Sequence, residues 1–458
     1  MTTTVVILAA GLGTRMRSKR AKVLHRAGGL ALVEHVVEAA RAVAPADSIV
    51  AVTGHQAEAV EELLAPRKIR FARQKKQKGT GHALACAREA APPSDLVMVL
   101  YGDTPLLSAD TLTRLRDAQA GSTAAATLIT TSLDAPAGYG RVILDATDAV
   151  RAIVEEKACT PEQRAIRLIN SGIYCFRADL LWAHLSEIQP TLPAGEYYLT
   201  DMAAILNTHG HRVEARHVAD SSELLGINTR IELADADRLL RRRKAEQLML
   251  EGVTIERPET VSIDSSVRIG MDTIVEPFAR ILGETVIGED CRIGAGAIVE
   301  SSVLADGAIV RPYTLIADSR VAEKAQIGPF ARLRMNANIG MDARVGNFVE
   351  VKKSRLGAGT KAQHLAYLGD AEIGDRVNVG AGTITCNFDG VKKNETRIGS
   401  GAFIGSNSTL VAPLEVGAES YLGAGSVITE DVPKQALALG RARQVVKTDW
   451  IEKRKKTE

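Results

Sequence analysis

Two basic residues follow a glycine-containing turn near the start of the sequence, and together they could bind phosphate. The turn is Gly11-Leu12-Gly13, directly after an apolar run. Arg15 and Lys22 lie just beyond it. Glycines let backbone N–H groups approach an anion, and a helix that starts there adds a favourable dipole. Neither the P-loop pattern nor the complete dinucleotide fingerprint is present, because Met16 replaces the third glycine. The combination fits a triphosphate.

Three further polar residues are candidates for chemistry, each with a plainer alternative. Asp103 follows the apolar run Leu96–Tyr101; the carboxyl edge of an open α/β sheet binds ligands, although an aspartate there could only cap a helix. Asn228 directly precedes Thr229 and could be a ligand or a turn residue. His364 could act as a general base near neutral pH, although a lone loop histidine is usually a surface residue.

The elements that must position the first of these residues alternate strands with helices. Strands are predicted at Val5–Ala10, Ser48–Thr53, Leu96–Tyr101 and Ala124–Thr130, and the segment Leu32–Ala44 between the first two is amphipathic. Such alternation implies βαβ units and a parallel sheet. The part of the chain up to about Arg230 is therefore predicted to be α/β.

One long charged helix is predicted from Thr229 to Glu251. Thr229 with Glu232 forms a capping-box pattern, and Gly252 is a plausible stop. Its basic run, residues 241–244, could suggest a nucleic-acid patch. Acidic residues share the segment, so a solvated helix face is the favoured interpretation.

After Gly252 an aliphatic residue recurs every six positions. The first run is Ile263, Ile269, Val275, Ile281, Ile287, Ile293 and Val299. The second, after a four-residue step, is Val303, Ile309, Leu315, Val321, Ile327, Leu333, Ile339, Val345 and Val351. The third is Ile398, Ile404, Leu410, Val416, Leu422 and Ile428. This period predicts hexapeptide repeats, in which three short strands close each triangular turn of a prism. The period breaks at Leu356–Ala371 and Thr385–Thr396, where loops are expected.

Composition agrees with this organisation and excludes several classes. The 458 residues are 45% hydrophobic and 24% charged, with a net charge of +2, so neither nucleic acid nor a membrane is expected as a partner. Aromatics are only 4% against 39 glycines, which suits a narrow aliphatic prism with tight corners. The five scattered cysteines predict reduced thiols in the cytoplasm and argue against a thiolate zinc site.

Five motifs make the resemblance to a known family specific. The first is Leu8–Met16 with Lys22-Val23-Leu24. The other four are Gly79-Thr80-Gly81-His82-Ala83, Tyr101-Gly102-Asp103-Thr104-Pro105, Gly138-Tyr139-Gly140-Arg141 and residues 195–201. These segments resemble sugar-nucleotide pyrophosphorylases. With the hexapeptide half, the whole chain resembles the bacterial bifunctional N-acetylglucosamine-1-phosphate uridyltransferase/glucosamine-1-phosphate acetyltransferases.

The resemblance implies a fold and two reactions. Residues 1–228 should form a Rossmann-like nucleotidyltransferase domain, 229–251 a linker helix, and 252–458 a left-handed parallel β-helix with a basic tail. The tail, residues 450–458, is expected to be disordered or loosely docked. Acetyl-CoA and glucosamine 1-phosphate should give N-acetylglucosamine 1-phosphate, which UTP then converts to UDP-N-acetylglucosamine with release of pyrophosphate. The family assembles as homotrimers, with CoA sites between neighbours.

Carried over by position, the resemblance implies the uridyltransferase residues. Arg15 and Lys22 should bind phosphates and act in catalysis, and Asp103 and Asn228 should ligate Mg²⁺. Gln74, Gly79 and Thr80 should hold the uracil, and Gly140, Glu155, Asn170 and Tyr198 the sugar. Leu8, Ala9, Ala10, Gly11, Tyr101 and Gly102 complete the implied substrate contacts. One departure is visible, since Ala21 stands where the family usually has proline before the lysine.

The acetyltransferase residues are implied in the same way. His364 should be the general base, with Glu350 fixing its tautomer. Arg334, Lys352, Tyr367 and Asn378 should bind the sugar phosphate. Ala381, Asn387, Phe388, Ser406, Ala424 and Arg441 should contact acetyl-CoA. Met335 and Phe388 replace a usual proline and tyrosine. Cys386 suggests an acetyl-cysteine intermediate, but no activating cation pattern surrounds it, and direct transfer is the family mechanism.

Two other functions remain open at this point. The prism could be a trimerising scaffold without acetyltransferase activity, although the residues around His364 argue against it. The chain could also be a non-enzymatic sugar-nucleotide sensor, for which Asp103, Asn228 and both cations would be needlessly complete.

Overall fold

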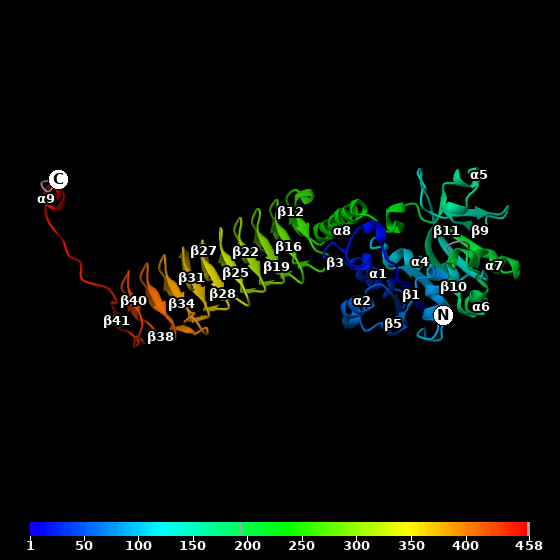
Figure 1. Ribbon diagram of the computed structural model, residues 1–458. Helices are drawn as coiled ribbons and strands as arrows, with labels where there is room; N and C mark the ends of the chain where they lie inside the picture. The colour runs from blue at the N-terminus through cyan, green and yellow to red at the C-terminus, as the bar shows by residue number, and fades with distance from the viewer. Residues whose placement is uncertain (192–194, 456–458) are drawn as a thin grey trace. The chain divides into compact units, whose positions relative to one another are not determined.

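The computed structural model describes residues 1–191 and 195–455, which form two compact units (Figure 1). The first unit is Met1–Leu240 and the second begins at Arg241, so the chain passes from one to the other within helix α8 (Arg230–Leu250). No helix in the described part of the chain is long and apolar enough to cross a membrane. The final residues of the predicted tail, 456–458, lie outside the described residues.

The first unit is built on a mixed sheet. Its strand order is β11 (Val213–His217), β7 (Ala126–Ser132), β10 (Leu168–Arg177), β6 (Leu96–Tyr101), β1 (Thr3–Leu8), β4 (Ile49–Thr53) and β5 (Arg70–Arg73). Strand β10 is antiparallel to both neighbours, whereas β1, β4, β5 and β6 are parallel. Strands β8 (Arg141–Leu144) and β9 (Val150–Val154) extend from β10, and β2 (Arg26–Ala27) pairs with β3 (Leu30–Ala31). The predicted parallel sheet is therefore interrupted by one antiparallel strand.

Helices cover both faces of this sheet. On one face lie α1 (Leu32–Ala40), α2 (Ala57–Leu64) and α4 (Ala109–Ala120). On the other lie α3 (Thr80–Ala87), α6 (Ala178–His184) and α7 (Met202–Thr208). Strand β1 packs Val5 and Ile7 into the first core and Val6 and Leu8 into the second. Burial on both faces explains why its sequence is continuously apolar. A further short helix is α5 (Pro161–Arg164).

Helix α8 begins and ends as its sequence predicts. The Thr229 hydroxyl accepts a hydrogen bond from the Glu232 N–H at 3.2 Å, and the Glu232 carboxylate accepts one from the Thr229 N–H at 2.9 Å. This reciprocal pair satisfies two of the N–H groups that a helix start leaves open. Gly252 follows the helix with φ of 97°, a left-handed conformation that favours glycine.

The second unit is a prism of three parallel sheets (green to red in Figure 1). The first sheet contains β12 (Thr254–Ile255), β15 (Ile274–Val275), β18 (Arg292–Ile293), β21 (Ile309–Val310), β24 (Gln326–Ile327), β27 (Arg344–Asn347), β30 (Lys361–His364), β33 (Asn378–Val379), β36 (Phe403–Ile404), β39 (Tyr421–Leu422) and β41 (Leu437–Ala438). The second contains β13 (Ser262–Ile263), β16 (Arg280–Leu282), β19 (Ile298–Glu300), β22 (Leu315–Ala317), β25 (Arg332–Arg334), β28 (Glu350–Lys352), β31 (Tyr367–Gly369), β34 (Ile384–Cys386), β37 (Thr409–Val411) and β40 (Val427–Ile428). The third contains β14 (Arg268–Ile269), β17 (Val286–Ile287), β20 (Val303–Leu304), β23 (Arg320–Val321), β26 (Asn338–Ile339), β29 (Arg355–Leu356), β32 (Ala371–Ile373), β35 (Thr396–Ile398) and β38 (Leu414–Val416). This is the predicted left-handed β-helix of hexapeptide repeats.

The inward positions of the repeat match the prediction except at the start of its second run. Val303 and Leu315 are 38% and 46% exposed, and their neighbours Leu304 and Ile316 fill the core instead. Val310 likewise replaces Ile309 in the core. Each of these strands carries two adjacent aliphatic residues, so the period alone does not determine which one points inward. From Val321 onward the predicted positions are the buried ones.

The two predicted loops have different outcomes. The first is wrong, because strands β30 and β31 continue the prism through Leu356–Ala371, with Ala362 and Leu368 buried in its core. The inward residue Ala362 is smaller than the aliphatic residues that define the period elsewhere, so the sequence pattern did not reveal this coil. The second is confirmed, since residues 387–395 form a loop between β34 and β35. Beyond the prism, helix α9 (Trp450–Lys455) is fully exposed, in keeping with a loosely docked tail.

Candidate active sites

The glycine turn that was predicted to bind phosphate follows β1 and is shaped by Gly13. This residue has φ of 62°, and a Cβ there would lie 2.6 Å from the Lys22 Cβ. The turn continues into two short 3-10 helices, Thr14–Met16 and Lys22–Leu24. The N–H of Ala21 donates to the Gln56 side chain at 2.8 Å, a bond that the proline usual in the family could not make.

Four of the predicted residues converge on one point. The Asn228 Oδ1 accepts hydrogen bonds from the Arg15 guanidinium at 2.9 Å and the Lys22 ammonium at 3.0 Å. The Lys22 ammonium also pairs with the Asp103 carboxylate. The backbone N–H of Ile227 donates to the Asp103 carbonyl at 2.9 Å, which ties the segment before α8 to the end of β6. Two cations and two oxygen ligands thus come together from positions far apart in the sequence.

A cavity of about 250 Å³ opens beside this cluster. Seven predicted uridyltransferase residues line it: Arg15, Tyr101, Asp103, Gly140, Glu155, Asn170 and Asn228. The Glu155 carboxylate accepts a hydrogen bond from the Thr200 hydroxyl at 3.1 Å, and its burial raises its pKa. Burial likewise raises the pKa of Tyr101. Sequence reasoning missed Thr200, although it lies within the recognised segment 195–201.

The predicted uracil residues form a second group, next to the segment that carries Tyr198. Gly79 has φ of 93°, and a Cβ on it would lie 2.5 Å from the Tyr197 carbonyl oxygen. The Gln74 amide donates to the Gly79 carbonyl at 3.0 Å, and the Thr80 hydroxyl accepts from the Leu199 N–H at 2.9 Å.

Tyr198 and Asn170 both have partners of their own within the protein. The Tyr198 hydroxyl donates to the Glu196 carboxylate at 2.6 Å, which raises its pKa to about 12. The Asn170 amide donates to the Tyr174 hydroxyl at 2.7 Å and accepts from the Gly172 N–H at 3.0 Å. Leu8 ends β1, and Ala9 and Ala10 lead from it into the glycine turn that begins at Gly11. Gly102 directly follows β6, the strand that pairs with β1.

A charged cluster marks the second sheet of the prism. Asp370 pairs with Lys352 at 3.5 Å and Lys353 at 3.4 Å, and it accepts a hydrogen bond from the Asn387 amide at 2.5 Å. The Asn387 amide also lies 3.5 Å from the Tyr367 hydroxyl. The structure therefore joins three of the predicted residues and adds Asp370, which sequence reasoning missed.

A groove of about 490 Å³ lies beside this cluster, and Asp370 and Lys393 both line it. Lys393 comes from the loop that interrupts the repeat. Sequence reasoning missed Lys393 too, although the break in the period pointed to its loop.

His364 does not have the partner that was predicted for it. Its Nδ1 lies 3.0 Å from the Asn347 Oδ1, whereas Glu350 accepts a hydrogen bond from Arg334 at 2.6 Å. The register explains this correction, because Asn347 is the residue opposite His364 in the β27–β30 ladder. Glu350 stands opposite Tyr367 in the neighbouring sheet.

His364 begins a column of predicted residues along one corner of the prism. It lies two positions after the inward residue of its strand, and Ala381, Ser406 and Ala424 lie at that same position after β33, β36 and β39. Successive coils are one strand spacing apart, about 4.8 Å, so the column runs parallel to the prism axis. Arg441 lies close to the end of this column, its Cδ 3.9 Å from a Cβ placed on Gly425.

Two predicted residues stand apart from these groups. Asn378 lies in β33, opposite Lys361 in the first sheet, whereas Arg334, Lys352 and Tyr367 belong to the second sheet. Phe388 is 59% exposed in the loop after β34. All five cysteines are free thiols. The backbone carbonyl of Cys386 accepts a hydrogen bond from the Ala412 N–H at 3.2 Å.

Comparison with known proteins adds three family matches. A MobA-like NTP transferase domain matches residues 5–168, and a hexapeptide repeat of succinyl-transferase matches 395–430. Residues 257–337 match a GMPPB C-terminal domain. The chain is 55% identical to the bifunctional protein GlmU of Solibacter usitatus, over 99% of this chain and 97% of that one. The corresponding identities are 51% for Koribacter versatilis and 45% for Heliobacterium modesticaldum, each over at least 97% of both chains.

The chain belongs to the GlmU family. This confirms the resemblance drawn from the motifs, and with it the prediction of a bifunctional enzyme. One activity transfers an acetyl group to glucosamine 1-phosphate, and the other transfers a uridylyl group to N-acetylglucosamine 1-phosphate. The readings of the prism as a mere scaffold and of the chain as a sensor are thereby set aside.

Proposed function

We propose that the uridylyl transfer takes place at the cluster of Arg15, Lys22, Asp103 and Asn228, and in the cavity beside it. The convergence of two cations and two oxygen ligands at the end of β6 is the observation that carries this proposal. Arg15 and Lys22 would bind the triphosphate of UTP, whose charge they neutralise. Gln74, Gly79 and Thr80 would hold the uracil, and Gly140, Glu155, Asn170 and Tyr198 the sugar.

The side chains present fit a magnesium ion. Asp103 and Asn228 offer a carboxylate and an amide oxygen, which are hard ligands of the kind Mg²⁺ prefers. Both oxygens already attract positive groups, since Lys22 contacts each of them. When bound, the ion would supply charge neutralisation on the phosphates.

The reaction then needs positioning more than covalent help. A phosphate oxygen of N-acetylglucosamine 1-phosphate attacks the α-phosphorus of UTP, a new P–O bond forms, and the bond to the pyrophosphate breaks. Arg15 and Lys22 stabilise the negative charge that the departing pyrophosphate carries. Gly140, Glu155 and Asn170 line the cavity and would orient the sugar for in-line attack.

We assign the acetyl transfer to His364 and the basic cluster of the second sheet. The Asn347 Oδ1 can only accept, so the His364 Nδ1 must carry the proton and its Nε2 is left with a lone pair. The Nε2 can therefore take a proton from the amino group of glucosamine 1-phosphate as the nitrogen attacks the thioester carbonyl. The C–N bond forms and the C–S bond breaks, and the proton held at Nε2 passes to the departing sulfur, so that CoA leaves as the thiol. Arg334, Lys352 and Tyr367 would hold the sugar phosphate.

Acetyl-CoA would lie along the corner column of Ala381, Ser406 and Ala424. These are small residues, which leave room for an extended ligand, and they continue the line that starts at His364. Asn387, Phe388 and Arg441 would contact the cofactor from the loop and from the end of the column.

An exposed apolar stripe supports assembly of the acetyltransferase site between copies of the chain. Phe278, Tyr313, Phe330, Phe348 and Leu365 are between 49% and 63% exposed. Three of them stack, with ring centroids 5.4 and 5.5 Å apart. The stripe ends beside His364, and exposed aromatic patches mark interaction surfaces. A second copy packed there would bring further groups to His364, in the homotrimer that the resemblance implies.

The free cysteines support a reducing, cytoplasmic location.

Two assays on three variants test the division of labour. Asp103→Asn should abolish pyrophosphate release from UTP and spare CoA release, and His364→Ala should do the reverse. His217→Ala, at an exposed histidine of β11 that belongs to neither site, is the control and should spare both. Joint loss of the activities in either active-site variant, with the fold intact, would refute separate sites.

A further inference from the structure

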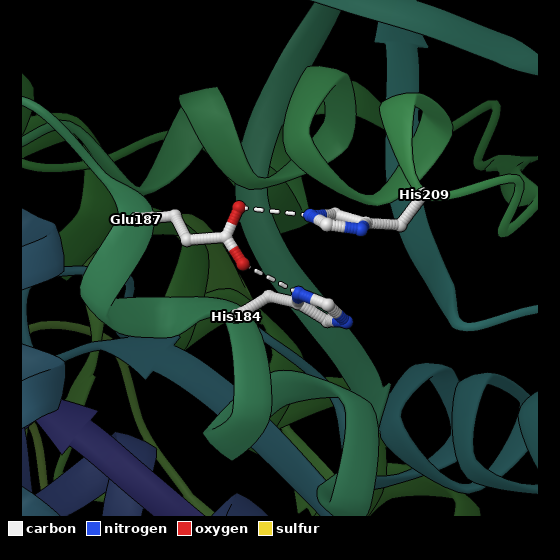
Figure 2. A group of neighbouring side chains, drawn as sticks. All are labelled: His184, Glu187 and His209. Carbon is white, nitrogen blue, oxygen red and sulfur yellow. Dashed lines mark hydrogen bonds and ion pairs between the residues drawn. The ribbon is translucent and has the colours of Figure 1, made fainter.

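Three side chains of the first unit converge outside both active sites (Figure 2). Glu187 lies between two imidazoles: its carboxylate is 2.7 Å from the His184 Nδ1 and 2.9 Å from the His209 Nε2. The two rings are 4.1 Å apart between centroids. A third imidazole, that of His211, has its centroid 5.8 Å from that of His184.

Three separate elements bring these groups together. His184 ends α6 and Glu187 ends the 3-10 helix Leu185–Glu187, so the two are three residues apart on one helical turn and face the same side. His209 is the residue directly after α7. The group is open to solvent on one side, because the Glu187 and His209 side chains are 43% and 42% exposed, whereas that of His184 is 16% exposed.

We propose that His184, Glu187 and His209 form a binding site for a divalent transition metal ion of the zinc class. Two imidazoles and one carboxylate are a ligand set that zinc accepts in proteins, with water in the fourth position. The ligand atoms all lie within 4.8 Å of one another. Zn–N and Zn–O bonds of about 2.0–2.1 Å place tetrahedral ligand atoms about 3.3 Å apart. The present nitrogen–oxygen separations of 2.7 and 2.9 Å, each to a different oxygen of the Glu187 carboxylate, need to widen by about half an ångström, and the other separations within the ligand set are at most 4.8 Å.

Metal binding at this site does not require the two neutral imidazoles to change their charge. Each neutral imidazole can carry its proton on either ring nitrogen, so the nitrogen that now faces Glu187 can present a lone pair to the ion.

A bound ion would join two elements that flank the sugar-site segment. α6 and its 3-10 extension precede Tyr198 and Thr200, and α7 follows them. The ion would cross-link the chain on both sides of this segment, and it would stabilise the fold because the site exists only in the folded state. Its role is therefore structural and separate from the Mg²⁺ proposed at Asp103.

Zinc titration of the full chain tests the proposal. The protein is treated with a chelator, returned to buffer with saturating Mg²⁺ so that the site at Asp103 is filled, and titrated with Zn²⁺ by calorimetry. His209→Gln and Glu187→Gln should each bind one equivalent fewer at high affinity, with the Kd of that site raised at least about tenfold. His217→Gln, at an exposed histidine of β11, is the matched control and should titrate like the unmodified chain.

Two further readouts do not depend on activity. Co²⁺ should give the visible absorption of a four-coordinate ion with the unmodified chain and not with His209→Gln. Zn²⁺ should raise the thermal midpoint of the unmodified chain more than that of either variant. Both substituted side chains are substantially exposed, and far-UV circular dichroism verifies that each variant folds. Equal stoichiometry and equal affinity in the unmodified chain and both variants would overturn the proposal, whatever zinc binds at the cysteines or at His364.

Discussion

Replacing Asn347 tests whether this residue, and not Glu350, orients His364, the proposed general base. Asn347→Ala removes the acceptor that lies 3.0 Å from the His364 Nδ1 and leaves the histidine in place. A neutral hydrogen bond contributes about 0.5–1.5 kcal/mol. If that energy is lost in the transition state, kcat for acetyl transfer falls about 2- to 13-fold. His364→Ala removes the base itself and should cost about 100-fold or more.

The assay follows CoA release with glucosamine 1-phosphate and acetyl-CoA, with pyrophosphate release from UTP as the internal control. Asn347→Asp should restore kcat, because a carboxylate also accepts from Nδ1.

A substitution at Glu350 tests the alternative, in which Glu350 is the residue that orients His364. Its carboxylate holds Arg334, so Glu350→Gln should raise the KM for glucosamine 1-phosphate and leave kcat nearly unchanged. A large fall of kcat in Glu350→Gln, together with an unchanged kcat in Asn347→Ala, would refute the assignment and reinstate Glu350 as the partner of His364.

Four other perturbations have defined outcomes. Gly79→Ala should abolish uridylyl transfer and spare acetyl transfer in paired assays, because its Cβ would overlap a carbonyl oxygen 2.5 Å away at a φ of 93°. Cys386→Ala should keep acetyl transfer largely intact, and near-total loss would favour an acetyl-cysteine intermediate. Ala21→Pro should change the free energy of unfolding by less than about 1 kcal/mol in denaturant titrations, since the lost bond to Gln56 is offset by a stiffer unfolded chain. Burial raises the pKa of Glu155, so the ionised form destabilises the fold above that pKa and the penalty is relieved as pH falls. Glu155→Gln should therefore raise the thermal midpoint at neutral pH, and the gain should shrink towards pH of about 4.

Much of the fold could be predicted because its signals are local and periodic. The aliphatic residue at every sixth position predicts the prism, and the apolar run of β1 predicts a strand buried on both faces. The capping pair of Thr229 and Glu232 predicts where α8 begins. Where two aliphatic residues are adjacent, as at Val303 and Leu304, the periodic signal is ambiguous, and packing against the neighbouring coils decides which one is buried.

The site was less accessible from the sequence, because its contacts depend on register and on long-range closure. The separation of 17 residues between Asn347 and His364 is one turn of the prism, but this is visible only once the coil through Ala362 is recognised as regular. The meeting of Lys22 with Asn228 spans 206 residues, and here only the family resemblance linked them. Asp370 and Lys393 carry no motif and emerge only from the packing of the loop.

The residues of the corner column are regularly spaced along the axis of the acetyltransferase half. Its members lie on successive coils, so neighbouring members are one strand spacing, about 4.8 Å, apart. They are His364, Ala381, Ser406 and Ala424. Gain or loss of a whole coil within the column would change the length of the proposed acetyl-CoA site by one strand spacing while every strand remained paired. Coils outside the column can be added or removed without altering the length of that site. The length of the prism and the length of the proposed acetyl-CoA site can therefore change independently of each other.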